Sequence, residues 1–189
     1  MLIRKINNAI RLIINNASFK LEIRKNGGKI DHGVRIGIRG CFKVGSHIVI
    51  SSKGIDSISV SKIILTRGAI LTIGNYTGMT SVSIFCKERI KIGDYVNIGA
   101  GSIIFDSNFH SIDWRIRRDI KRDVALSKNS PVIIEDDVLI GSRCIIMKGV
   151  HIGARSIIAA GSVVYHDIPA DCIAGGNPCV VMKKIDSAR

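Results

Sequence analysis

The chain has 189 residues, of which 46% are apolar and 23% are charged, a length that suits one globular domain and a composition that excludes a disordered chain. Lys and Arg outnumber Asp and Glu by 28 to 15, and the formal net charge of +13 predicts anionic partners. The five cysteines include no CxxC pair, which argues against a zinc site or a disulfide framework and favours a reducing, cytoplasmic setting.

Residues 1–29 form a basic segment that begins with helical spacing. Its apolar positions recur every three or four residues: Leu2, Ile3, Ile6, Ile10, Ile13, Ile14 and Ala17. Its only acidic residue is Glu22, against seven basic ones: Arg4, Lys5, Arg11, Lys20, Arg24, Lys25 and Lys29. We predict an amphipathic helix over 1–17. It either caps the open end of the domain that follows or lies on an anionic membrane surface.

A six-residue period dominates the rest of the chain. Aliphatic residues recur at every sixth position: Ile134, Ile140, Ile146, Ile152, Ile158 and Val164, with the same spacing at Ile92, Ile98 and Ile104. Helices repeat near 3.6 residues and simple strands near 2, so a sustained period of six indicates neither. A hexad suits one short strand and one corner, three hexads close a triangular coil, and stacked coils pair as parallel strands. The sequence therefore predicts an all-β parallel β-helix.

This pattern resembles the hexapeptide-repeat acyltransferases, whose fold is a left-handed parallel β-helix. The resemblance covers roughly residues 30–185 and is most specific at 134–181, which ends in AAGSVV, DIP and AGGNP. It implies the left-handed coil, because the general preference for right-handed crossovers would suggest the opposite. It also implies an enzyme that uses acetyl-CoA and forms a homotrimer.

The repeat is interrupted at residues 106–130, and His110 lies where it breaks. The string Asp106-x-Asn108-x-His110 resembles the D-x-D-x-H form of sugar and polysaccharide O-acetyltransferases, with Asn108 where Asp is common. The resemblance implies that His110 is the catalytic base. An imidazole, with an ordinary pKa of about 6.5, can take the proton of an acceptor hydroxyl and return it to the thiolate of coenzyme A. Asp106 and Asp113 are both candidates for the group that orients His110.

The interruption also contains a basic arm, WRIRRDIKR, at residues 114–122. This arm is either a solvated loop or short helix, or a cover whose cations contact an anionic acceptor or the phosphates of the cofactor. Trp114 could stack on a sugar ring or fix the arm to the coils. Trp114, Arg117 and Arg118 are therefore candidate acceptor-binding residues, together with Asp106, Asn108 and Asp113.

The resemblance also implies where the cofactor binds. In the resembled family the pantetheine arm lies in a groove between neighbouring subunits, held by backbone groups of successive coils. The matching positions here are Gly141, Ser142, Ala159, Ala160 and Gly161. Near the C-terminus, Tyr165 and His166 replace a frequent Thr-Lys pair, and Lys183 and Lys184 stand for the family's basic residues. These nine residues form the predicted cofactor site, and no metal is expected.

Together these features predict a CoA-dependent O-acetyltransferase that acts on a sugar or surface-glycan precursor, in the cytoplasm or at the inner face of the membrane. The alternatives are N-acetylation of an amino sugar, acetylation of another small hydroxyl acceptor, or a non-enzymatic β-helix binding protein. A γ-type carbonic anhydrase needs three metal-ligating histidines, and His110 has no companion at a suitable spacing. Nucleic acid is not expected as a partner, because the aromatic residues are sparse and no binding motif is present.

Overall fold

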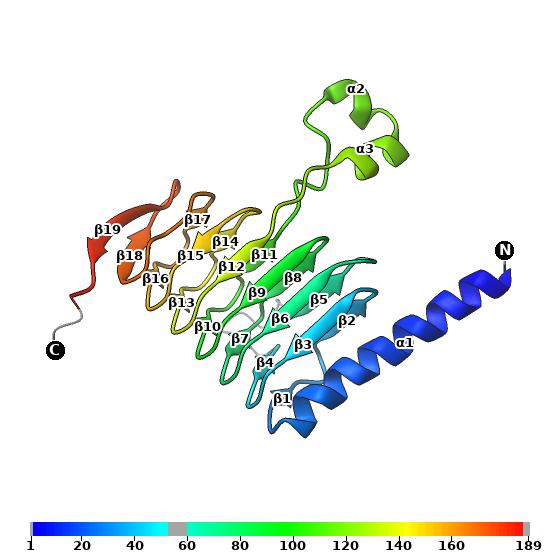
Figure 1. Ribbon diagram of the computed structural model, residues 1–189, viewed down its shortest axis with the longest axis horizontal. Coiled ribbons are helices and arrows are strands. Elements are labelled where there is room, and N and C mark those ends of the chain that lie inside the picture. Colours follow the sequence, from blue (N-terminus) through cyan, green and yellow to red (C-terminus); the bar gives the residue numbers. More distant parts are fainter. Residues whose placement is uncertain (1, 53–59, 187–189) are drawn as a thin grey trace.

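The chain folds into a parallel β-helix with a long helix at one end and an arm that projects from its middle (Figure 1). The computed structural model describes residues 2–52 and 60–186, with side chains from residue 6 onward in these ranges. Successive strands visit three flat faces in turn, which we call A, B and C, and every pairing within them is parallel except that of the last two strands. The predicted triangular coil is confirmed.

Each face is one sheet that runs the length of the solenoid. Face A contains β1 (Lys29–Ile30), β4 (Val49–Ser51), β7 (Gly78–Thr80), β10 (Asn97–Ile98), β13 (Leu139–Ile140), β16 (Ile157–Ile158), β18 (Cys172–Gly175) and β19 (Val180–Lys184). Face B contains β2 (Arg35–Ile38), β5 (Lys62–Leu65), β8 (Ser83–Cys86), β11 (Ile103–Phe105), β14 (Ile145–Ile146) and β17 (Val163–Val164). Face C contains β3 (Cys41–Val44), β6 (Ile70–Ile73), β9 (Arg89–Ile92), β12 (Val132–Ile134) and β15 (His151–Ile152).

The hexad aliphatics stack on one another inside the solenoid. Ile98 pairs with Ile140, and Ile140 with Ile158, so that identical side chains lie in register along face A. All six residues of the predicted series from 134 to 164 are at most 1% exposed. Burial of these aliphatics is the main stabilising contribution of the solenoid, because stacked coils share one continuous apolar core.

The corners between the faces are tight turns. Along the corner from face C to face A, one residue of each coil adopts a left-handed φ between 54° and 59°: His47, Tyr76, Tyr95, Asp137, Arg155 and Asp171. Neighbouring coils also approach closely at the corner from A to B. A Cβ atom on Gly141 would lie 2.5 Å from the backbone nitrogen of Ala160, so this position admits only glycine without a shift of the coil.

The N-terminal helix α1 (Leu2–Lys25) is longer than the predicted 1–17, and only its C-terminal part is buried against the solenoid. Phe19 and Ile23 are fully buried there, and the ring of Phe19 contacts that of Phe42 edge-on at 5.2 Å. Asn16 continues the ladder of β2: its side chain donates to Ile36 O (2.9 Å) and accepts from Ile38 N (2.9 Å). The cap is therefore made by residues 15–23.

The predicted apolar positions of residues 6–17 do not contribute to this cap. Ile6, Ile10, Ile13 and Ile14 are all exposed, and the side chains of Leu2, Ile3, Arg4 and Lys5 lie outside the described residues. Within the described ranges, no helix combines the length and hydropathy that crossing a bilayer requires.

Candidate active site

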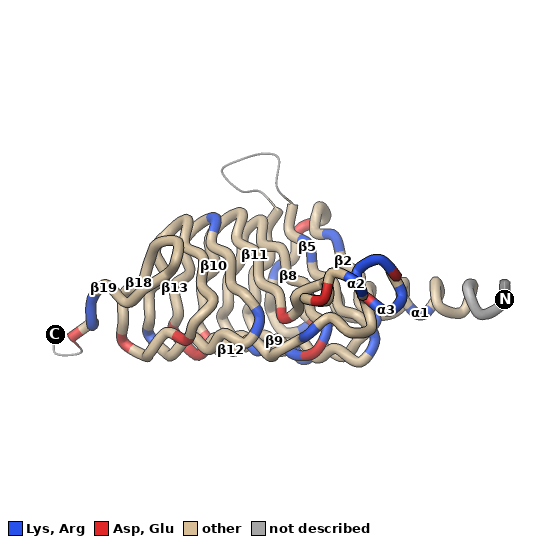
Figure 2. The backbone as a smooth tube through the Cα atoms, turned by 90° about the horizontal axis from the view of Figure 1, so that it is seen from above, with Lys and Arg blue, Asp and Glu red and all other residues tan. Residues whose placement is uncertain are grey.

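The arm that carries His110 leaves the solenoid at the corner between faces B and C. It starts after β11, contains two short helices, α2 (Trp114–Arg117) and α3 (Ile120–Leu126), and returns to β12. Asp113 and Asp119 cap the two helices, because their carboxylates accept backbone N–H groups of the first turns. Figure 1 shows the arm standing off the coils, and Figure 2 shows basic residues at its helices.

Asp106 fastens the base of the arm to the preceding coil. Its carboxylate is fully buried and accepts the backbone N–H groups of Lys87 (2.7 Å), Glu88 (2.7 Å) and Arg89 (2.8 Å). Lys87 then reaches across to the arm, where its ammonium donates to Val124 O (2.9 Å) and to the hydroxyl of Ser127. These contacts make Asp106 a structural residue of the arm.

His110 is held by Asp123 of α3. The ring atom Nδ1 lies 2.6 Å from Asp123 Oδ2, and the other carboxylate oxygen accepts the backbone N–H of Ser111 at 2.6 Å. The side chain of Asp123 is 5% exposed, whereas that of His110 is 68% exposed. The hydrogen bond from His110 and that from Ser111 lower the pKa of Asp123, so this carboxyl is ionised at neutral pH. An ionised partner requires the proton on Nδ1, which leaves Nε2 as the basic nitrogen.

Asp106 and Asp113, the two carboxylates that the sequence offered as partners of His110, therefore bind other groups. Asp106 binds the backbone of residues 87–89, and Asp113 caps α2 and pairs with Arg115 at 3.0 Å. Hydrogen bonds from Arg115 lower the pKa of Asp113. Asp123 was missed, because it comes 13 residues after His110 in a segment without a repeat, and only the folding of α3 brings the two together. Asn108 takes part through its backbone. Its N–H donates to Lys128 O (2.9 Å), and its carbonyl oxygen accepts the N–H of His110 (2.7 Å).

The residue before His110 anchors the loop on aromatic rings. Phe109 packs on Phe85 (ring centroids 4.8 Å apart) and on Phe105 (5.3 Å). Phe109 also has a φ of 62°, which is unfavourable for a bulky side chain and persists only where the surroundings hold it. The aromatic cluster therefore fixes the direction in which His110 leaves the solenoid.

Two of the predicted acceptor-binding residues have structural partners within the arm. Arg117 donates to the carbonyl oxygens of Ser111 and Ile112, both at 2.8 Å, and so closes the loop after His110. Arg118 lies over the ring of Trp114, with its guanidinium carbon 4.5 Å from the centroid. Trp114 itself is 54% exposed and does not fix the arm to the coils.

One chain does not bring the small residues of the predicted cofactor site to the corner that carries His110. Gly141, Ser142 and Ala159–Gly161 follow β13 and β16, at the corner from face A to face B, whereas the arm leaves from B to C. Tyr165 and His166 lie after β17 with their rings 4.5 Å apart, and Lys183 and Lys184 lie on the exposed terminal strand β19. The small residues therefore lie at a different corner from the arm.

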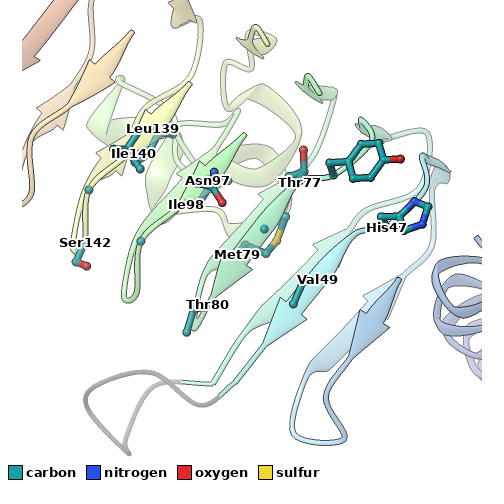
Figure 3. A pocket seen from close by; sticks show the side chains of 14 residues that line it. His47, Val49, Thr77, Met79, Thr80, Asn97, Ile98, Leu139, Ile140 and Ser142 are labelled. Atoms are coloured by element: carbon teal, nitrogen blue, oxygen red, sulfur yellow. The ribbon is translucent and has the colours of Figure 1, made fainter. Parts of the chain in front are cut away.

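A pocket of about 520 Å³ lies on face A and includes two of these small residues (Figure 3). Gly141 and Ser142 line one side of it, and His47 and Tyr76 lie at the other. Along the corner from face C to face A, the rings of His47, Tyr76 and Tyr95 form a parallel stack, with successive centroids 4.7 Å and 4.9 Å apart. Ala159–Gly161 do not line this pocket.

A basic groove runs between α1 and face B, with a volume of about 870 Å³. Three arginines from α1 and two successive corners line it, Arg11, Arg39 and Arg67, and none of its lining residues is acidic. Ile64 and Phe85 of face B also line it, and the ring of Phe85 contacts that of Phe109 next to His110. The periodicity gave no signal for this groove, because the groove forms only once α1 lies against the coils.

Across the part of the chain that the structure describes, no three His, Cys, Asp or Glu side chains are grouped as metal ligands would be.

Comparison with known proteins agrees with this architecture. Residues 131–166 match the family model of the hexapeptide repeat of succinyl-transferase. This part of the chain is therefore a hexapeptide repeat. A hexapeptide-repeat acetyltransferase from Vibrio cholerae is similar in structure, with a TM-score of 0.55 and 38% identity over 62% of this chain and 64% of that one. The predicted resemblance and the left-handed parallel β-helix are thereby confirmed.

Two further comparisons describe similar proteins. The Vibrio cholerae acetyltransferase in complex with acetyl coenzyme A has a TM-score of 0.51 and 29% identity, over 82% of this chain and 72% of that one. A 2,3,4,5-tetrahydropyridine-2,6-dicarboxylate N-acetyltransferase from Staphylococcus aureus is 54% identical over 54 residues, 29% of this chain. The match spans only 23% of that protein's length. The sequence similarity to this relative is therefore confined to a short stretch.

Proposed function

We propose that the chain is a CoA-dependent O-acetyltransferase that moves the acetyl group of acetyl-CoA to a hydroxyl of a sugar or surface-glycan precursor. The observation that carries the proposal is the His110–Asp123 pair, with its 2.6 Å contact, on an arm that interrupts the hexapeptide repeat. The Vibrio cholerae relative that binds acetyl coenzyme A supports the choice of co-substrate. The D-x-N-x-H string supports a hydroxyl acceptor, by its resemblance to sugar O-acetyltransferases.

The arrangement suits direct transfer within a ternary complex. Nε2 of His110 takes the proton of the acceptor hydroxyl as its oxygen attacks the thioester carbonyl. The C–S bond then breaks, and the imidazolium returns the proton to the departing thiolate. Asp123 holds the ring in the tautomer with the proton on Nδ1, and its negative charge stabilises the imidazolium. No covalent acyl-enzyme is needed, so the reaction requires neither a nucleophilic serine nor a cysteine.

We further propose that each site is completed by a neighbouring copy in a homotrimer. A cofactor that reaches both His110 and the residues at Gly141–Gly161 must contact two corners of the coil. In a trimer of triangular prisms, the arm of one chain can lie beside the small-residue corner of the next. The nine cofactor residues predicted from sequence, Gly141 to Lys184, remain the proposed contacts in this arrangement.

The basic groove supports an acceptor with negative charge. Arg11, Arg39 and Arg67 line it together with Phe85, whose ring contacts Phe109, the residue before His110. An extended anionic glycan or sugar phosphate could lie along the groove with one hydroxyl at His110. Because exposed arginines attract anions through a screened field, the KM for such an acceptor should rise with salt.

N-acetylation is the second candidate, because the Staphylococcus aureus relative bears the name of an N-acetyltransferase. The same base could remove a proton from an amine as it attacks the thioester. The product would then be an amide, which resists the mild hydroxylamine treatment that cleaves an ester.

Thiol release from acetyl-CoA tests both candidates. The protein is incubated with nucleotide sugars, free sugars, amino sugars and lipid-linked glycans, and each product is weighed and treated with hydroxylamine. We expect turnover with a glycan acceptor and a hydroxylamine-labile product. A stable acetyl product would favour the amine acceptor. Absence of both turnover and CoA binding would contradict the proposed function.

A further inference from the structure

Only the C-terminal half of α1 buries apolar side chains, Phe19 and Ile23, whereas its N-terminal half turns a polar side toward the solenoid. Asn15 and Asn16 donate to the carbonyl oxygens of Ile38 (3.2 Å) and Ile36 (2.9 Å) on face B. The apolar side chains point the other way: Ile10, Ile13 and Ile14 are 50%, 67% and 56% exposed. An amphipathic helix that only capped the solenoid would have the opposite orientation, with its apolar face buried.

The exposed apolar residues form one continuous stripe. With about 100° of rotation per residue, Ile6, Ile10, Ile13 and Ile14 fall within an arc of about 100°, on the side opposite Phe19 and Ile23. Ala17 and Leu21 continue this stripe toward the C-terminal half of the helix, and both are exposed. We call these six residues the apolar stripe: Ile6, Ile10, Ile13, Ile14, Ala17 and Leu21. Contiguous apolar surface of this kind marks an interaction site.

The position of α1 in the fold leaves the stripe open. The helix lies against the first coils at its C-terminal half and runs on beyond the end of the solenoid (Figures 1 and 2). It therefore lies at one end of the molecule, where the stripe can meet a flat surface without hindrance from the arm.

The charges beside the stripe indicate what that surface is. Lys20 and Lys25 lie at its two edges, Arg24 follows it one turn after Leu21, and the one acidic residue among the described side chains of α1 is Glu22. An apolar stripe bordered by cations is the composition of a helix that lies in the headgroup region of an anionic bilayer. Packing the stripes of two copies in parallel would bring these cations close to one another, which disfavours that arrangement of a second copy.

We propose that α1 binds the surface of an anionic membrane through its apolar stripe, with Lys20, Arg24 and Lys25 contacting lipid phosphates. The helix lies in the plane of the interface and does not cross the bilayer. Three copies in a trimer would present three such helices and raise the affinity by multivalency.

Sedimentation of the full-length protein with vesicles tests the proposal. One set contains phosphatidylcholine alone, and the other contains phosphatidylcholine mixed with phosphatidylglycerol. We expect the protein to sediment with the anionic vesicles and to be released as salt is raised. The double variant Ile10→Glu/Ile13→Glu should lower this affinity by about tenfold or more, because two charges would enter the apolar layer.

Matched variants show whether a loss of vesicle binding is specific to the apolar stripe. Ile120→Glu makes the same change at an isoleucine of α3 that is 77% exposed, and it should bind vesicles like the unaltered protein. Thermal unfolding shows whether the double variant is folded, and Ile13→Ser provides a milder change at the stripe if it is not.

Two results would overturn the proposal. The first is a failure of the unaltered protein to bind anionic vesicles, and the second is equal binding by a folded stripe variant. If the first result comes with a smaller oligomer for the stripe variant, the stripe is a contact between copies. None of these results depends on acetyl transfer, so they are distinct from the test of the proposed function.

Discussion

The coils and the arm of this protein are held together by different interactions. In the coils, aliphatic side chains such as Ile140 and Ile146 are fully buried and stack in register across parallel strands. In α2 and α3 of the arm, Asp123 is the one buried residue. The arm is attached to the coils by polar contacts at Asp106 and Lys87 and by the rings around Phe109, and Asp123 holds His110 within it.

Because of this difference, we expect the coils to determine the stability of the protein and the arm to determine its activity. Burial of apolar surface stabilises the coils, whereas the arm buries little and contributes little to the free energy of unfolding. The arm nevertheless carries His110, so substitutions there should alter activity more than stability. Substitutions in the coils should have the reverse effect.

The largest expected effect is on the stability of the coils. Ile146→Ala should lower the free energy of unfolding by about 2–5 kcal/mol, because a fully buried side chain is removed and the stacked coils cannot close the cavity. Ile120→Ala in the arm, where the side chain is 77% exposed, should change it by less than about 0.5 kcal/mol. Urea unfolding of the two variants provides the measurement. Equal destabilisation by both would show that the arm is part of the same cooperative core.

Asp123→Asn should lower the turnover number by at least about tenfold with little change in the KM for acetyl-CoA. The amide can donate a hydrogen bond to Nδ1, which would move the ring proton to Nε2 and block the basic position. Steady-state kinetics with a competent acceptor measures both constants. Asp123→Glu keeps the charge and should retain more activity, whereas equal loss in both variants would indicate a merely structural role.

The pH dependence of stability tests whether the charge of Asp123 stabilises the arm. Hydrogen bonds from His110 and Ser111 lower the pKa of Asp123, so its contribution is present above the unfolded value of about 3.9 and is lost as pH falls through the lower folded pKa. The unaltered protein should therefore be more stable than Asp123→Asn at about pH 6, and the difference should shrink as the pH falls below the unfolded value of about 3.9. Urea unfolding at several pH values tests this. A difference that persists in acid would mean that packing, and not charge, distinguishes the two proteins.

The smallest expected effect is a difference in thiol labelling that leaves stability unchanged. Burial and the adjacent Asp106 carboxylate raise the pKa of Cys86 to about 12, and burial also raises the pKa of Cys144 and Cys179. Cys41, by contrast, is exposed. A thiol reagent at about pH 8 should therefore label Cys41 in the native protein, because the thiolate is the reactive form. Mass spectrometry locates the label, and equally rapid labelling of Cys86 would show that the base of the arm is open.

The sequence predicted the coils far better than the arm. Residues such as Ile134 and Ile152 follow a period that only a stacked solenoid satisfies, so their burial could be foreseen. Asp123 could not be assigned, because its contact with His110 depends on how two short helices fold over a loop without periodicity. The orientation of α1 was equally inaccessible. Its spacing predicts an apolar stripe, but only the contacts of Asn15 and Asn16 show that the stripe faces away from the coils.

The central claim is that His110, held by Asp123, is the base for acetyl transfer. Its most direct test is the turnover of acetyl-CoA by His110→Ala with a competent acceptor, measured beside the affinity of the same variant for CoA. We predict a loss of about 10²- to 10⁴-fold in turnover with nearly unchanged CoA affinity, because the proposed cofactor contacts lie on the coils and not on the arm. Turnover equal to that of the unaltered protein would contradict the account.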